Sequence, residues 1–338
     1  METRKVQLSG GTTYTISLPK PWAQEHGIDS ESLVALHPNG DASLLVEVVD
    51  EGGPTDRTAV VDIGTADAKA LEQQLIALYV VGFDSIELRD STGLGDDQRR
   101  TVETALAELS GFELIEATNA RIRVKSLIDA GNVDVRKSAL RLRLVTLSML
   151  EDALSAIVDR DSDLARDVVR RDTEADKLFA MVTRHFRRSL TNLQEVAKLA
   201  YSRDELFEYY YVCRQFERVA DHAEKMATFA SHEQRTIPDP LAEHLDRFGE
   251  AARAILENAA DVVLLDADVE MAHEALARRD TLCRDIDDID RELYDHGEPD
   301  AAYTTGLLLD SIERIANYGA NVAEIGVQQA LRENAPPS

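Results

Sequence analysis

Carboxylate side chains recur at four-residue spacing in two segments that have helical periodicity. Asp172 and Asp176 form the first pair. Glu217 and Asp221 form the second pair, and Glu224 continues it by about one turn. Residues four apart lie on one face of a helix with Cβ atoms roughly 6 Å apart, so two adjacent helices would gather all five carboxylates. A hard cation would remove the repulsion within such a cluster, which predicts a divalent or ferric ion: Fe, Mg, Mn or Ca.

The same carboxylates have two explanations that need no metal. An acidic protein readily presents solvated acidic faces, and arginines within the same segments are possible ion-pair partners: Arg171, Arg214 and Arg218. His222 lies beside the carboxylates, but a lone histidine is more often a packing or surface residue than a ligand. The residues therefore leave a metal site and a solvated or ion-paired acidic face both open.

The segments that carry these carboxylates occur twice. Residues 169–173 read VRRDT and residues 277–281 read ARRDT. Residues 217–221 read ERVAD and residues 313–317 read ERIAN. Two matches in the same order indicate a duplicated three-helix unit rather than six unrelated helices.

The second copy retains fewer carboxylates than the first. Asp280 and Glu313 are kept, whereas Arg284 and Asn317 stand at the positions that match Asp176 and Asp221. An arginine supplies positive charge in place of a metal, so we expect this second site to be empty or weakly occupied.

At these residues the chain resembles the PhoU family of phosphate-uptake regulators. Residues 216–227 (FERVADHAEKMA) and 312–324 (IERIANYGANVAE) look like two copies of the family's third-helix signature, and the resemblance covers about residues 135–332. It implies two three-helix bundles, a dimer, and metal clusters held by E/D-x-x-x-D motifs. It also implies repression of high-affinity phosphate import, by contact with the phosphate ABC transporter, its ATPase or its signalling proteins.

Hydrophobic periodicity predicts six helices in this region. A stripe of aliphatic residues marks the first helix: Leu140, Leu144, Leu147, Leu150, Leu154 and Ile157. The helices expected after it cover residues 164–199, 202–231, 241–266, 268–294 and 302–330. They form two repeats, residues 135–236 and 241–332, which are separated by a proline-containing linker.

Residues 57–126 alternate between strand and helix patterns. Strands are expected at residues 58–63, 85–88, 113–117 and 120–124, and helices at residues 67–81 and 96–109. This order predicts a small α/β unit with helices on one face of a sheet. Gly93 and Gly95 stand between a strand and a helix, but no P-loop lysine follows them, so a plain loop is expected and no chemistry is assigned.

Residues 1–50 have short strand patterns, with turns at Gly10-Gly11 and Asn39-Gly40. Residues 16–20 (ISLPK), with the Trp-Ala that follows, resemble the AbrB/MazE-like swapped-hairpin family, whose members form intertwined dimers and often bind DNA. The resemblance places candidate DNA contacts on three cations: Arg4, Lys5 and Lys20. Seven acids against these three cations oppose phosphate contacts, so a pure dimerisation module is the alternative.

Composition limits the remaining possibilities. The chain has 338 residues and a formal charge of −26, with 29 arginines and only eight lysines. This balance argues against a broad nucleic-acid surface and indicates a halophilic protein, with an acidic protein from a low-salt organism as the alternative. No apolar run approaches the ~18 residues of a membrane span. The N-terminus lacks a signal-peptide pattern and the two cysteines form no CxxC motif, so we expect a cytoplasmic protein and no integral membrane protein.

Together these patterns predict a mainly α protein: two tandem three-helix bundles, preceded by a small β swapped-hairpin domain and a small α/β unit. We expect a homodimer that negatively controls high-affinity phosphate transport and binds DNA through its N-terminal domain. The alternative is a metal-binding helical scaffold that acts only by protein contacts. An enzyme is not expected, because a single Glu-x-x-His motif, at residues 270–273, falls short of the two that a di-iron bundle needs.

Overall fold

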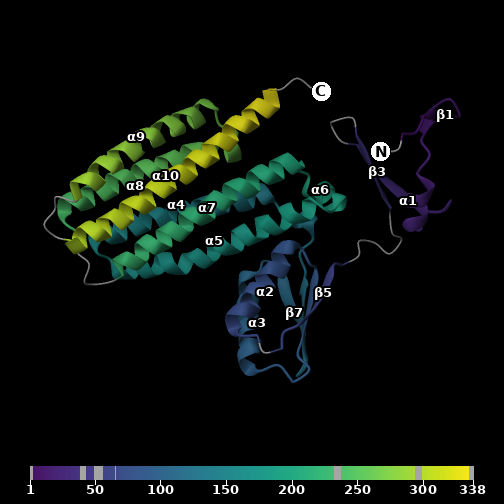
Figure 1. Ribbon diagram of the computed structural model, residues 1–338, viewed down its shortest axis with the longest axis horizontal. Coiled ribbons are helices and arrows are strands. Elements are labelled where there is room, and N and C mark those ends of the chain that lie inside the picture. The colour runs from purple at the N-terminus through teal and green to yellow at the C-terminus, as the bar shows by residue number, and fades with distance from the viewer. Residues whose placement is uncertain are drawn as a thin grey trace. The chain divides into compact units, whose positions relative to one another are not determined.

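The structure is a computed structural model that describes residues 3–38, 43–48, 56–64, 66–231, 237–293 and 299–334. The chain divides into two compact units, one up to residue 56 and one from residue 57 onward, and each is described by itself. Long helices dominate the second unit (Figure 1). Among the residues placed here, no helix combines the length and the apolar composition that a bilayer crossing needs.

The first unit consists of two separate hairpins and a short helix. Its elements are β1 (Gln7–Ser9), β2 (Thr13–Thr15), α1 (Lys20–Glu25), β3 (Val34–Pro38) and β4 (Leu44–Val48). β1 pairs with β2 and β3 pairs with β4, both antiparallel. Gly10 and Gly11 have φ angles of +63° and +79°, which the tight turn between β1 and β2 requires. The expected Asn39-Gly40 turn lies outside the described residues.

The described residues of the first unit form no buried core. None of its described residues is buried. Leu8, Tyr14 and Leu36 are 60 %, 76 % and 57 % exposed. Isolated two-stranded hairpins are marginally stable in water, so these apolar side chains need a further surface to cover them.

The second unit begins with a small α/β layer structure. Its elements are β5 (Thr58–Asp62), α2 (Ala68–Val81), β6 (Ser85–Arg89), α3 (Asp96–Glu108), β7 (Phe112–Ala117) and β8 (Arg121–Ser126). The sheet order is β5-β6-β8-β7, with β5 and β6 parallel and the other neighbours antiparallel. Leu75 and Tyr79 of α2 share one core with Ile86 and Val124 of the sheet. The opposite sheet face is charged, since Glu87 pairs there with Arg89 and Arg123.

In the part of the chain that the structure describes, seven α-helices follow the α/β layer. The first repeat contains α4 (Val135–Asp159), α5 (Ser162–Ser189), α6 (Leu193–Leu199) and α7 (Arg203–Ala230). The second contains α8 (Asp239–Leu265), α9 (Glu270–Leu293) and α10 (Pro299–Asn334). α8 and α10 pack together, and they contact the first repeat through α4 and α7 (Figure 1). The predicted mainly α fold with two helical bundles is confirmed.

Two expectations about these helices are wrong. The single helix predicted over residues 164–199 is two helices, because the Asn192 side chain caps α6 by accepting two backbone N–H bonds from its first turn. Leu144, which was assigned to the apolar stripe, is 63 % exposed, because the fully buried face of α4 carries Leu142 and Met149 instead. The helix predicted over residues 202–231, by contrast, is α7, and a capping box of Ser202 and Glu205 forms its N-terminus.

The repeats share a pattern of buried positions, with one shift. The buried residues Leu142, Met149 and Ala153 of α4 recur in α8 as Phe248, Ile255 and Ala259. In α5 and α9 the buried positions align one residue away from the alignment of the VRRDT and ARRDT motifs. The buried residues of α9 that correspond to Ala165, Val168 and Ala175 of α5 are Ala272, Ala275 and Leu282. Arg279, rather than Asp280, therefore occupies the position of Asp172.

Candidate metal centre

Three carboxylates from two helices converge at the surface of the first repeat. Asp172 and Asp176 project from α5, and Asp221 projects from the adjacent α7. Each offers an oxygen that lies within 4.8 Å of the others'. The cluster forms because Val168, Ala175 and their apolar neighbours bury one side of α5 and leave this face toward α7.

The electrostatics of the cluster favour the binding of a positive charge. Burial, followed by Asp176 and the α7 carboxylates, raises the pKa of Asp172 to about 7. Burial and Asp221 raise the pKa of Glu217 to about 7. Burial, followed by Asp221, raises the pKa of Asp176 to about 6. The pKa values of Asp221 and Glu224 are raised as well, mainly by burial, so all five predicted carboxylates of this repeat carry an unfavourable charge when ionised.

Nearby arginines leave this cluster largely uncompensated. Arg171 turns away and pairs with Asp152, while its Nη1 donates to Ser148 Oγ at 2.9 Å. Arg214 reaches Glu217 only at 3.7 Å and lies over the Phe179 ring. Asp172 Oδ1 and Glu217 Oε2 are buried without a hydrogen-bond partner. Arg218 is exposed, and its charge only partly offsets the raised pKa of Asp221.

A residue of the α/β layer adds to the same cluster. Glu108, at the end of α3, is among the charges that raise the pKa of Asp176. Lys177 Nζ fixes this helix end by donating to the carbonyl oxygen of Ala107 at 2.7 Å. No signal in the sequence links Glu108 to the α5 motif, because the two meet only through the packing of α3 against α5.

The second repeat does not assemble an equivalent cluster among the described residues. The Asp280 side chain is 68 % exposed and pairs with the neighbouring Arg279 Nε at 3.0 Å. Arg279 Nη1 donates to Asn317 Oδ1 at 3.2 Å, so an arginine–amide contact occupies this place. Burial, Asp287 and Asp310 raise the pKa of Glu313, but Glu313 and Asp280 belong to no common group of potential ligands.

The other predicted site residues lie in the first unit. Arg4 and Lys5 are exposed just before β1, and Lys20 is exposed at the first position of α1.

His222 lies on α7 one residue after Asp221, with its ring 5.8 Å from that of Tyr318. Burial lowers the pKa of His222 to about 4, which fits a neutral packing residue.

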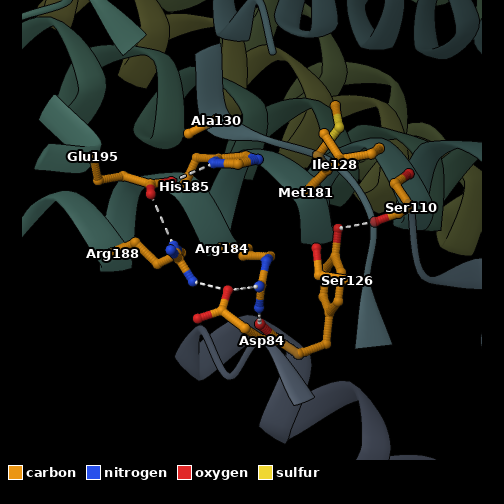
Figure 2. A pocket seen from close by; sticks show the side chains of 11 residues that line it. Asp84, Ser110, Ser126, Ile128, Ala130, Met181, Arg184, His185, Arg188 and Glu195 are labelled. Atoms are coloured by element: carbon orange, nitrogen blue, oxygen red, sulfur yellow. Dashed lines mark hydrogen bonds and ion pairs between the residues drawn. The ribbon is translucent and has the colours of Figure 1, made fainter. Parts of the chain in front are cut away.

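α5 also anchors the α/β layer, through two arginines near its C-terminal end. Figure 2 shows Arg184 and Arg188 converging on Asp84. Arg184 Nη1 donates to the Tyr79 carbonyl at 2.7 Å and Arg188 Nη1 to the Gly82 carbonyl at 3.0 Å. These bonds satisfy one carbonyl in the last turn of α2 and that of its C-cap residue. The partly open pocket beside these residues has a volume of about 20 Å³, which is room for about one water molecule. The same helix thus positions the carboxylate cluster and fixes the α/β layer beside it.

The donor set fits a hard cation. Every group that reaches the centre is a carboxylate, and oxygen ligands are those that Mg, Ca and Mn prefer. Asp172 Oδ1 is buried and has no hydrogen-bond partner among the described residues, so a cation would stabilise it. The two Glu-x-x-His motifs of oxidising di-iron bundles are not found here, since the sequence has one such motif, at residues 270–273 on α9.

Comparisons with known proteins bear on the same helices. None of the curated proteins compared with the chain matches it. PhoU from Pseudomonas aeruginosa superposes with a TM-score of 0.49 at 22 % identity, covering 59 % of this chain and 96 % of that one. The phosphate transport system regulatory protein PhoU from Streptococcus pneumoniae gives a TM-score of 0.48 at 18 % identity, covering 60 % and 96 %. Residues 139–230, which carry the carboxylate cluster, match the family model of the PhoU domain.

Proposed function

We propose that this protein is a PhoU-type regulator that acts in the cytoplasm and negatively controls high-affinity phosphate import. The match of residues 139–230 to the PhoU domain carries the proposal. The duplicated helical pattern extends the same architecture over the second repeat. The regulator acts by contact with the phosphate ABC transporter, its ATPase or its signalling proteins.

The first unit supports a second activity of the regulator, which is binding to DNA. Its exposed apolar residues on both hairpins suit an intertwined homodimer, in which two copies cover each other's strands. Arg4, Lys5 and Lys20 are exposed and would provide the phosphate contacts. Chromatin immunoprecipitation of the tagged protein, in phosphate-replete and phosphate-depleted cells, tests this output. Phosphate-dependent enrichment upstream of transporter genes, weakened by Arg4→Ala with Lys5→Ala, is the expected result.

A second candidate function follows from the charge of the first unit. Its seven acids among residues 1–50 oppose phosphate contacts, which favours a scaffold that acts only by protein contacts and uses this unit for dimerisation. Absence of enrichment in both phosphate states, with the dimer intact, would select this alternative over the DNA-binding regulator.

The carboxylate cluster would hold a divalent or ferric ion in either case. Geometry supports this, since three carboxylates meet and two buried oxygens have no hydrogen-bond partner. Elemental analysis of the purified dimer should find metal that is lost in Asp172→Asn with Asp221→Asn. The matched change in the second repeat, Asp280→Asn with Glu313→Gln, should leave the metal content unchanged. If the first double variant keeps the full metal content, the ion does not bind at this cluster.

A further inference from the structure

The second repeat contains an apolar groove between α8 and α9. Its volume is about 470 Å³, within the roughly 300–1,000 Å³ of small-molecule sites. Phe248, Ile255 and Leu282 form its floor and are 2 %, 0 % and 4 % exposed. Small side chains leave the space above this floor open: Ala251, Ala254 and Ala277. Such a lining, mostly apolar with a few polar groups, is typical of ligand sites.

At the corresponding place in the first repeat, an ion pair closes the space between the two helices. In that repeat Arg141 of α4 donates from Nε to Glu174 Oε1 of α5 at 3.0 Å. The shared burial pattern places Arg247 at the position of Arg141 and Thr281 at the position of Glu174. Thr281 carries no charge, so the arginine of the second repeat has lost its partner across the groove.

A second cross-helix link is lost at the same place. Arg171 of α5 contacts Ser148 and Asp152 of α4. Arg278 takes its position in α9, but Ala254 stands where Ser148 would have accepted a hydrogen bond. Arg278 pairs instead with Glu274 of its own helix, at 3.6 Å.

The lining of the groove carries two arginines, Arg247 and Arg278, of which Arg278 also pairs with Glu274 of its own helix. Arg247 and Arg278 are both exposed and line the groove. The contacts described for Arg247 are His244 Nδ1 at 3.3 Å and the Phe248 ring at 4.8 Å, neither of which neutralises it. Asp285 is the one acid that lines the groove among the described residues. An acid group on a ligand would therefore meet two guanidinium groups beside an apolar floor.

We propose that the α8–α9 groove binds an amphipathic organic anion. The apolar body of the ligand lies on Phe248, Ile255 and Leu282, and its carboxylate or phosphate group is held by Arg247 and Arg278. This site is independent of the proposed metal centre, which lies on α5 and α7. It gives the second repeat a function of its own, in place of the carboxylate cluster that it lacks.

Octanoate tests the proposal, with 1-octanol as its neutral counterpart. Isothermal titration of the full-length protein should show saturable octanoate binding, one equivalent per chain. Arg247→Gln with Arg278→Gln should weaken octanoate binding by about tenfold or more, because charge-assisted hydrogen bonds are lost. Binding of 1-octanol should change little in this variant, since the floor is intact.

Closing the groove provides the matched variant. Ala251→Val with Thr281→Glu introduces the residues of the first repeat, Val145 and Glu174, and should abolish octanoate binding while thermal unfolding stays cooperative. Equal octanoate binding in the closed variant, or no saturable binding to the wild-type protein up to about 10 mM, would overturn the proposal. Dissociation of oligomers in the closed variant, without octanoate binding to the wild type, would identify a second copy as the occupant and overturn it as well. If the closed variant fails to fold, the arginine variant decides.

Discussion

Single residues explain why the two repeats differ at their acidic faces. Asp172 and Asp176 were predicted as ligands from their spacing, and the structure brings them to Asp221. Arg279 could not be foreseen, because the motif match aligned Asp280 with Asp172, and only the packing of α9 reveals the shift by one residue. Glu108 was missed for a similar reason, since its proximity to Asp176 depends on contacts between segments far apart in sequence.

Glu195 gives a residue-scale prediction about acid stability. It is 2 % exposed; burial alone would raise its pKa, but His185 and Arg188 outweigh burial and hold the pKa below its ordinary value. A carboxyl group with a lowered pKa in the folded state stabilises the fold above its unfolded pKa, and this contribution is lost as the pH falls through the folded pKa. Glu195→Gln should therefore cost about 1–3 kcal/mol at pH 7, and this difference should shrink below about pH 4.5.

Chemical denaturation of both proteins from pH 7 to pH 3 measures this effect. Glu103→Gln, at an exposed position of α3, is the matched control and should leave the unfolding free energy within about 0.5 kcal/mol of the wild type. A constant loss across the whole pH range in Glu195→Gln would show that its charge contributes nothing.

Among the elements, α5 connects the parts of the second unit. Its Asp172 and Asp176 face the cluster, and its Arg184 and Arg188 hold the end of α2 two to four turns later. Periodicity predicted α5 because its apolar residues repeat at helical spacing. It did not predict the end of α5 near residue 190, because the polar cap at Asn192 was hidden within a continuing apolar pattern.

The packing of α8 against α10 gives a prediction at the same scale. A Cβ on Gly319 would lie 2.9 Å from Ile255 Cγ2 and 3.0 Å from the backbone nitrogen of Leu256. Backbone atoms cannot move aside independently, so Gly319→Ala should destabilise the protein by about 1–3 kcal/mol in urea unfolding. Gly306→Ala in the same helix meets its nearest atom, Asp290 Oδ1, at 3.6 Å, and should stabilise by up to about 1 kcal/mol. Equal effects of the two changes would contradict this view of the helix contact.

For the whole molecule, the sequence predicted the long helices better than it predicted how the first unit is covered. Strong 3.6-residue periodicity and capping residues specify long helices locally, whereas none of the described residues of the first unit is buried. The surface that covers its hairpins is therefore not provided by the described residues of that unit. The charge of −26 led to the expectation of a halophilic protein, which stays a prediction.

The proposed homodimer can be tested on the exposed apolar residues of the first unit. Leu8→Glu with Leu36→Glu places charges on both hairpins, and light scattering should show a shift from dimer to monomer because charges resist burial in an interface. Leu144→Glu changes an equally exposed leucine on α4 and should leave the dimer intact. A dimer that survives the double change would place the interface elsewhere.

The central proposal is that this protein represses phosphate import, and uptake of radiolabelled phosphate tests it most directly. Cells with the gene deleted should import phosphate rapidly even when phosphate is plentiful, and the wild-type gene should restore repression. Complementation with Asp172→Asn and Asp221→Asn tells whether the carboxylate cluster is required. Phosphate uptake that remains fully repressed in the deletion strain under phosphate-replete conditions would contradict the proposed function.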